Sequence, residues 1–258
     1  MKIGVIGFGT VGEAIAKGFN FLGYRVYVND KEKFAIYSKK YLMENCDVTF
    51  ICVQTPPKED GSIDLSRIYE VIDEVAKYKP KSVIVIKSTV TPGTTVKLSK
   101  EYPEITFAVN PEFLRHKHAL TDFINPSKIV IGAEDRGVAF KISSLYSKIK
   151  VPKIITDPTT AETIKYINNA FLSLKVAFSN EVKNICETLK VDPREVMYAV
   201  CLDRRINPSH LDPVKGLISG KCLPKDLYAI IKLCENKCKT PLLKATSHYI
   251  DKKVQLYT

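Results

Sequence analysis

The sequence predicts an α/β protein: a doubly wound, mostly parallel sheet followed by a mainly helical domain with a long central helix. Short apolar runs alternate with amphipathic segments up to about residue 157, the order expected of parallel strands joined by helices. A glycine-rich turn follows the first apolar run. Beyond Pro158 the alternation stops, and apolar residues recur at helical spacing.

The first apolar run and the turn after it have the pattern of a nucleotide-binding loop. We expect a strand over residues 2–6, a helix after the turn, and a second strand over 24–28. In this order the pattern is the dinucleotide-binding fingerprint of a Rossmann-type sheet. The turn reads Gly7, Phe8, Gly9, Thr10, Val11 and Gly12.

Each glycine of this turn has its own task in the expected complex. Gly7 makes the turn, Gly9 lets the backbone approach a pyrophosphate, and Gly12 lets helix and strand pack closely. The helix N-terminus offers N–H groups and its positive dipole end to the phosphates. Asp30 can accept hydrogen bonds from the adenosine ribose, which favours NAD over NADP. Nearby lysines, Lys33 among them, weaken that preference and are candidate cofactor contacts.

The other elements of the first domain follow in chain order. Continuous apolar strands fit a sheet buried on both faces, and we place this NAD-binding domain at 1–157. The expected strands cover 47–53, 82–86, 105–109, 128–132 and 153–155, and the expected helices cover 31–46, 65–78 and 137–147. A mainly helical domain is expected over 158–258, with one helix over 159–190 and another beginning at Asp192-Pro193.

A second glycine-rich stretch precedes a cysteine. Gly216 and Gly220 allow the backbone to turn tightly. Neighbouring cations such as Lys225 favour the nucleophilic thiolate form of Cys222. Asp226 lies one helical turn further on, if a helix begins near this point. The ordinary alternative is a buried cysteine before a proline-initiated helix.

Composition limits the classes of partner. The net charge is +11, but the lysines are spread along the chain without a basic block, so we expect a solvated surface and no nucleic-acid binding. No apolar run is long enough to span a bilayer. The seven cysteines show no paired metal-ligand spacing, so we expect reduced thiols, a cytoplasmic protein and no metal.

With its segments placed, the sequence resembles the UDP-glucose/GDP-mannose dehydrogenase family. Members oxidise the C6 alcohol of a nucleotide sugar to a carboxylate with two NAD, so the resemblance implies such a 6-dehydrogenase, with UDP-glucose as the expected substrate. The matching blocks are the 7–12 turn, Lys87-Ser88-Thr89, Asn110-Pro111-Glu112-Phe113-Leu114-Arg115, Asp122-Phe123 with Pro126, Ala161-Glu162 with Lys165 and Asn169, Asn180-Glu181, Asp203 with Arg205-Ile206, and Cys222-Leu223-Pro224-Lys225-Asp226.

The resemblance also implies catalytic roles. Cys222 corresponds to the family's nucleophile, which captures an aldehyde as a thiohemiacetal that is oxidised to a thioester and hydrolysed. Glu112 corresponds to the carboxylate that activates the water. Lys165 and Asn169 correspond to the pair that stabilises the oxyanion and positions the sugar. Asp226 corresponds to an acid–base partner.

Binding roles follow from the same resemblance. Thr55, Thr89 and Lys225 correspond to cofactor contacts. Arg205 corresponds to an arginine that reaches the substrate from the partner subunit, and the helix over 159–190 implies a homodimer. The implied substrate contacts are Glu112, Phe113, Leu114, Arg115, His116, Lys165, Asn169, Arg205, Gly216 and Gly220.

The chain departs from the family pattern in four places. His116 stands where the family has glutamate, and Leu217 and Ser219 stand at glycine positions. The segment 31–46 is shorter than in the family, and full-length members continue beyond the position of Thr258 into a domain that grips the nucleotide. Two alternatives therefore stay open: a two-electron β-hydroxyacid-type dehydrogenase, which needs no thiol, and a catalytically degenerate protein that binds NAD or a sugar nucleotide.

Overall fold

The computed structural model describes residues 1–31, 37–214 and 222–255, the last four by their backbone alone. The chain divides into two compact units. One comprises Met1–Pro56 and Ile63–Lys165, and the other Pro57–Ser62 and Tyr166–Thr258. No helix in the described residues is long and apolar enough to cross a membrane.

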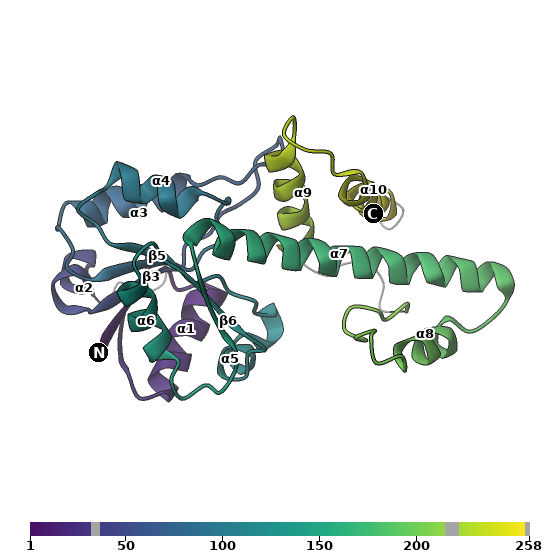
Figure 1. Cartoon of the computed structure of the whole chain (residues 1–258), viewed down its shortest axis with the longest axis horizontal. Coiled ribbons are helices and arrows are strands. Elements are labelled where there is room, and N and C mark those ends of the chain that lie inside the picture. The colour runs from purple at the N-terminus through teal and green to yellow at the C-terminus, as the bar shows by residue number, and fades with distance from the viewer. Residues whose placement is uncertain (32–36, 215–221, 256–258) are drawn as a thin grey trace. The chain divides into compact units, whose positions relative to one another are not determined.

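In the described part of the first unit, seven strands form one sheet in the order β2-β1-β3-β4-β5-β6-β7. Figure 1 shows this sheet between its helices. Five of the neighbouring pairs are parallel, and the β5–β6 pair is antiparallel, joined at Val109 and Gly132. The predicted mostly parallel, doubly wound sheet is therefore confirmed. The strands are β1 (Lys2–Ile6), β2 (Arg25–Asn29), β3 (Val48–Ile51), β4 (Val83–Ile86), β5 (Phe107–Val109), β6 (Ile129–Gly132) and β7 (Lys153–Thr156).

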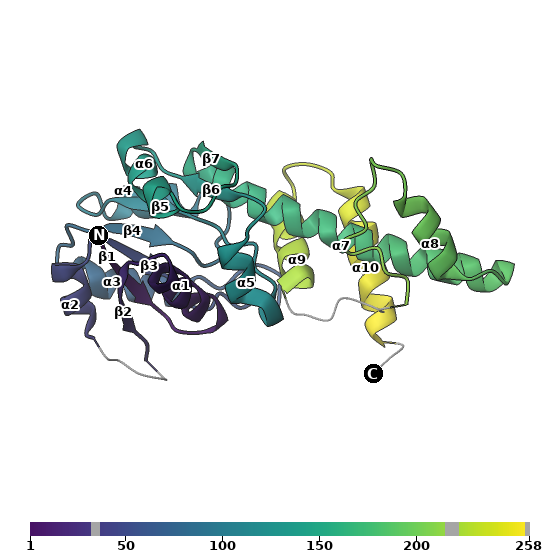
Figure 2. The ribbon, with the colours of Figure 1, turned by 90° about the horizontal axis from the view of Figure 1, so that it is seen from below.

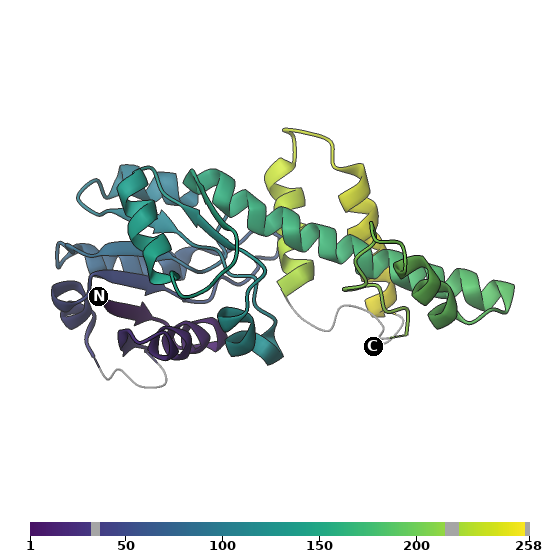
Figure 3. The ribbon, with the colours of Figure 1, turned by 60° about the horizontal axis from the view of Figure 1, so that its bottom comes forward.

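Helices cover both faces of this sheet. Successive strand residues point to opposite faces, so Val85 joins one apolar core, beneath α1, α5 and α6, and Ile84 joins the other, beneath α2, α3 and α4. The helices α1 and α5 lie side by side (Figures 2 and 3). The described helices of this unit are α1 (Thr10–Phe21), α2 (Lys39–Asn45), α3 (Ser66–Ala76), α4 (Thr94–Glu101), the short 3-10 turn η1 (His116–His118), α5 (Ala119–Ile124) and α6 (Arg136–Leu145).

The helix expected over 31–46 is only partly present. The structure begins α2 at Lys39, because the Ser38 side chain accepts a hydrogen bond from the Tyr41 N–H at 3.1 Å and caps the helix there. Residues 32–36, Lys33 included, lie outside the described residues. The prediction missed α4, which follows Gly93 in a left-handed conformation (φ 94°).

A single long helix, α7 (Pro158–Leu189), starts in the first unit and continues through the second. It confirms the long helix expected over 159–190. In the second unit, Ser173 Oγ donates to the Leu223 carbonyl at 3.3 Å and holds the start of α9 (Cys222–Cys234) to α7. Asn184 Nδ2 and the Tyr249 hydroxyl, 3.3 Å apart, join α7 to α10 (Pro241–Gln255).

Asp192 caps α8 (Pro193–Cys201), as its Asp-Pro start indicated. The Asp192 side chain accepts from the Arg194 N–H at 2.8 Å, and proline occupies the first turn. The loop 57–62 also belongs to the second unit, where a side chain at Gly61 (φ 82°) would contact Tyr228 of α9. We retain the boundary at 157/158 as a prediction.

Candidate active site

The glycine turn after β1 is sterically constrained at two positions and open at the third. A Cβ atom on Gly7 (φ 93°) would lie 2.8 Å from the Cys52 backbone, and one on Gly12 would lie 1.9 Å from the Gly7 carbonyl oxygen. A Cβ atom on Gly9 would meet nothing within 4 Å. Gly7 and Gly12 are therefore required by packing, whereas the space at Gly9 suits a ligand that approaches the backbone.

Asp30 is tied to the same turn. The Phe8 N–H donates to Asp30 Oδ2 at 2.5 Å, and the Gly7 N–H donates to the Asn29 carbonyl at 2.9 Å. The end of β2 therefore holds the turn in place through one side chain and one backbone group. Contact between Asp30 and a ribose stays a prediction.

His116 lies against the first helical residue after the turn. The atoms Thr10 Oγ1 and His116 Nε2 are 3.1 Å apart, although 106 positions separate the residues in the sequence. Both side chains are at least partly exposed, and Val11 beside them is half-buried. The structure thus puts His116, expected as a substrate contact, at the N-terminus of α1, where the pyrophosphate of a cofactor is expected.

Two loops at the carboxyl edge of the sheet are tied together. Thr55 follows β3 and Thr89 follows β4, and the Thr55 hydroxyl donates to the Thr89 carbonyl at 2.8 Å. Ser88 Oγ donates to the Val53 carbonyl at 2.5 Å. Cofactors of doubly wound sheets bind at this edge, so Thr55 and Thr89 lie on the side of the sheet where a cofactor is expected. Their contact with a cofactor stays a prediction.

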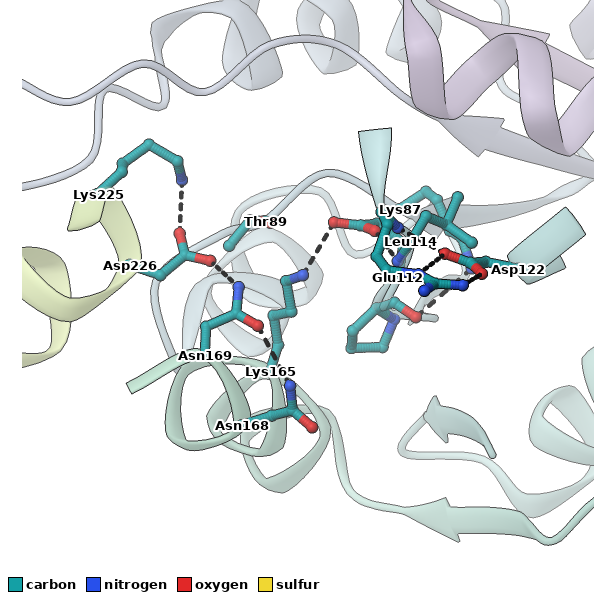
Figure 4. Close-up of polar contacts among 12 residues, drawn as sticks. Lys87, Thr89, Glu112, Leu114, Asp122, Lys165, Asn168, Asn169, Lys225 and Asp226 are labelled. Carbon is teal, nitrogen blue, oxygen red and sulfur yellow. Dashed lines mark hydrogen bonds and ion pairs between the residues drawn. The ribbon is translucent and has the colours of Figure 1, made fainter. Parts of the chain in front are cut away.

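Glu112 and Lys165 form a largely buried ion pair in the first unit. Lys165 Nζ lies 2.9 Å from Glu112 Oε1, and the two side chains are 6% and 12% exposed (Figure 4). The Leu114 N–H donates to the second oxygen of Glu112 at 2.6 Å. Burial raises the pKa of Glu112, but the charge and hydrogen bond of Lys165 oppose it. With further lowering by the Leu114 N–H and the charge of Lys87, the pKa of Glu112 lies below its ordinary value.

Aromatic and cationic side chains surround this pair. Lys165 Nζ lies 5.5 Å and Lys128 Nζ lies 4.5 Å from the ring centroid of Phe113. Both distances are typical of cation–π contacts. Arg115 points its guanidinium at Asp122 in a two-point fork, at 3.0 and 2.6 Å. The Arg115 side chain is therefore engaged with Asp122 in this structure, and its predicted substrate contact is untested.

A second polar cluster lies in the helical unit. Asn169 Nδ2 donates to Asp226 Oδ2 at 2.6 Å, and Lys225 Nζ lies 2.7 Å from Asp226 Oδ1 (Figure 4). Asp226 is 1% exposed, so its charge is compensated by an ammonium group and an amide in place of water. On the continuous helix α7, Asn169 follows Lys165 by one turn.

Cys222 is the first residue of α9 and is exposed. The alternative of a buried cysteine before the helix is therefore wrong. Asp226 follows one turn later on the same helix. By contrast, burial raises the pKa of the Cys52 thiol to about 12. Gly216, Leu217, Ser219 and Gly220 lie outside the described residues.

Arg205 lies on the surface of the second unit. Its side chain is 88% exposed, and its guanidinium forms a fork with Asp203, with Nε 3.0 Å from Oδ1. Such a group is accessible to a second molecule. Its predicted contact with the substrate of a partner subunit is untested.

The sequence analysis assigned no function to three buried polar residues, although they belong to the blocks that match the family. They are Lys87, Asn110 and Glu162, and they are 5%, 1% and 2% exposed. Glu162 accepts hydrogen bonds from the Gly93 and Thr95 N–H groups at 2.6 and 2.9 Å and so caps α4. The sequence could have singled out Lys87, because it is a lysine directly after four apolar strand residues.

Fold and glycine turn together define a dinucleotide-binding protein of the doubly wound class. Residues 34–150 match the NAD binding domain of the UDP-glucose/GDP-mannose dehydrogenase family, and residues 159–250 match its central domain. The chain therefore belongs to the UDP-glucose/GDP-mannose dehydrogenase family, as the sequence blocks indicated.

Relatives of known name or structure agree with this assignment. The protein YtcA of Bacillus subtilis is 34% identical over 100% of this chain and 69% of its own length. A UDP-glucose 6-dehydrogenase of Rickettsia prowazekii is 38% identical over 84% of this chain and 52% of its own. The structure of a UDP-glucose dehydrogenase from Pyrobaculum islandicum superposes with a TM-score of 0.88 at 33% identity, covering 97% of this chain and 68% of that one. The chain thus spans between about half and about two thirds of these relatives.

Proposed function

We propose that this protein is an NAD-dependent nucleotide-sugar 6-dehydrogenase that converts UDP-glucose to UDP-glucuronate. The observation that carries the proposal is the pair Lys165 and Asn169, one turn apart on α7 and each held by a buried carboxylate. The exposed Cys222 supplies the nucleophile that a four-electron oxidation needs. Relatives named UDP-glucose 6-dehydrogenase support the choice of sugar nucleotide.

The glycine turn fits the cofactor. The open space at Gly9 admits a pyrophosphate close to the backbone, and Asp30 at the end of β2 is the acidic group for a ribose. NAD bound there would accept one hydride in each of the two oxidations. Thr55 and Thr89, at the carboxyl edge, are the candidate contacts further along the cofactor.

Cys222 performs the covalent part of the proposed reaction. After the C6 alcohol has lost a hydride and a proton, the sulfur adds to the aldehyde carbon and a thiohemiacetal forms. Loss of a second hydride and a proton leaves a thioester. Water then adds to the carbonyl carbon, the C–S bond breaks, and the carboxylate and the thiol are released.

Glu112 and Lys165 serve the hydrolytic step. A pKa below the ordinary value keeps Glu112 ionised at neutral pH, so its carboxylate can take a proton from the attacking water. The Lys165 ammonium donates to the oxygen on which negative charge develops. Asp226 holds the Asn169 amide in one orientation through the 2.6 Å hydrogen bond, and the Asn169 carbonyl accepts from Asn168 Nδ2 at 3.2 Å. The second N–H of the Asn169 amide can then position the sugar.

An exposed apolar face on α7 supports the proposed homodimer. Large apolar side chains that are at least half exposed recur at helical spacing along this helix. A face of this kind on a soluble protein marks an interaction site. It consists of Ile167, Phe171, Phe178, Ile185 and Leu189.

The test of the proposed function is the stoichiometry of the reaction. The protein is incubated with NAD and UDP-glucose, and the NADH formed is counted per sugar consumed; two per sugar is the expected result. Cys222→Ala should abolish acid formation and leave NAD affinity unchanged, whereas Cys238→Ala, at another exposed cysteine of the same unit, should behave as wild type.

Other outcomes identify the open alternatives. One NADH per molecule of a small hydroxy acid, undiminished in Cys222→Ala, would identify a two-electron dehydrogenase. NAD binding without turnover of any sugar nucleotide would identify a binding protein.

A further inference from the structure

We propose that Lys87 is a positioning residue for Glu112: its ammonium group fixes the loop that carries this carboxylate and keeps the carboxylate ionised. The inference rests on the proposed function, because it explains how Glu112 is prepared to act on water. Lys87 lies in one of the blocks that match the family, but neither the sequence nor the resemblance assigned a role to it.

The geometry shows how Lys87 holds the loop. Lys87 follows β4 directly and is 5% exposed. Its Nζ donates to Asn110 Oδ1 at 2.8 Å and lies 3.5 Å from the Pro111 carbonyl oxygen. These two acceptors belong to the two residues immediately before Glu112, so the ammonium group anchors the backbone from which the Glu112 side chain projects.

Asn110 is itself held by hydrogen bonds to other parts of the first unit. Its Oδ1 also accepts from the Tyr146 hydroxyl at 2.6 Å, and its Nδ2 donates to the Val130 carbonyl at 2.6 Å. The loop before Glu112 is therefore bound to β4, β6 and the end of α6 by hydrogen bonds that are shielded from water. Such bonds hold a side chain in one geometry.

The charge of Lys87 also acts on Glu112 directly. It is one of the causes that lower the pKa of Glu112. Burial lowers the pKa of Lys87 itself to about 8, with Cys52 and Glu112 opposing and Lys165 assisting that shift. At neutral pH Lys87 is therefore mostly a cation. Its other ionisable neighbours, the Cys52 thiol and the Tyr146 phenol, have raised pKa values and stay neutral.

Stability does not account for this lysine. A buried ammonium group is costly to desolvate, and an apolar side chain of similar volume in its place is often neutral or stabilising. The depressed pKa of Lys87 shows that burial disfavours the charge. The arrangement is explained if the charge serves the neighbouring carboxylate.

The experiment measures the titration of Glu112 in variants of Lys87. Protein with ¹³C-labelled glutamate carboxyls is titrated by NMR, and the Glu112 signal is assigned by its absence in Glu112→Gln. In Lys87→Met the pKa of Glu112 should rise, because one of the causes that lower it is removed. The acidic limb of acid release should shift upward with it, whereas Lys87→Arg should restore both values towards wild type.

Lys39→Met is the matched control. Lys39 is also a buried lysine of the first unit, but its ion pair is with Glu74, at 2.5 Å. We expect no movement of the Glu112 titration in this variant. If Lys87→Met does not fold, Lys87→Gln removes the charge while keeping a donor, and it should show the same upward shift.

The results separate this inference from the proposed function. If the pKa of Glu112 is unchanged in Lys87→Met, the inference is overturned, even if UDP-glucuronate is formed. If the same variant also has a lowered melting temperature, the role of Lys87 is structural. If the wild type releases no acid, the proposed function fails, and the carboxyl titration still decides whether Lys87 controls Glu112.

Discussion

Lys165 Nζ and Glu112 Oε1 lie 2.9 Å apart in the interior of the first unit, although the residues are 53 positions apart in the sequence. One partner comes from α7 and the other from the loop after β5. A charge in such a place is stable only while its partner is present.

Removal of one partner of this pair should destabilise the protein. We expect Lys165→Met to lower the free energy of unfolding by about 3 kcal/mol, because Glu112 would lose its nearest cation. Urea denaturation measures the change. The control is Lys97→Met, which breaks the exposed Lys97–Glu101 pair and should cost clearly less, because water screens such a pair. Equal losses in the two variants would contradict the prediction.

The depressed pKa of Lys87 predicts a pH-dependent stability. The folded-state pKa is about 8, against an ordinary 10.5. Between these values the unfolded chain keeps a proton that the folded protein has lost, so the contribution of this group to stability rises with pH. From pH 7 to pH 10, the free energy of unfolding of wild type should therefore rise relative to that of Lys87→Met. A constant difference over this range would refute the prediction.

Alanine substitutions at Gly9 and Gly12 should have different effects, one on NAD binding and the other on stability. Gly12→Ala places a Cβ 1.9 Å from the Gly7 carbonyl oxygen, so we expect a loss of about 2 kcal/mol in stability from overpacking. Gly9→Ala meets no neighbour within 4 Å and should keep its melting temperature while weakening NAD binding about tenfold. Calorimetry with NAD and thermal denaturation measure the two effects. Wild-type affinity in Gly9→Ala would show that the cofactor binds elsewhere.

The apolar face of α7 should hold the proposed dimer together. Phe171 is 58% exposed on this face, and a charge there would be buried in the interface, so Phe171→Glu should be monomeric in light scattering. Phe140→Glu is the control, because Phe140 is 57% exposed on α6 of the other unit. If Arg205 acts in the site of the partner, the monomeric variant should also lose turnover while it keeps NAD affinity. A dimeric Phe171→Glu would exclude this face.

Much of the fold was predictable because its signals are local. The glycine turn requires small residues at fixed spacing, the buried strands are continuous apolar runs, and α7 has an uninterrupted helical period. The start of α2 was missed because one hydrogen bond, from the Tyr41 N–H to Ser38, decided it against a longer helical pattern.

By itself, the sequence determined which residue types are available and the order of the elements: a nucleotide-binding turn, a mostly parallel sheet, a long helix and a cysteine at the start of another helix. Only the tertiary structure decided the pairing of charges. Lys87 is held by Asn110, Glu162 caps α4, and Asp226 is bonded to Asn169, 57 positions away. Local spacing carries no information about these partners, because each pair is brought together by the packing of separate elements, and burial then makes every such bond obligatory.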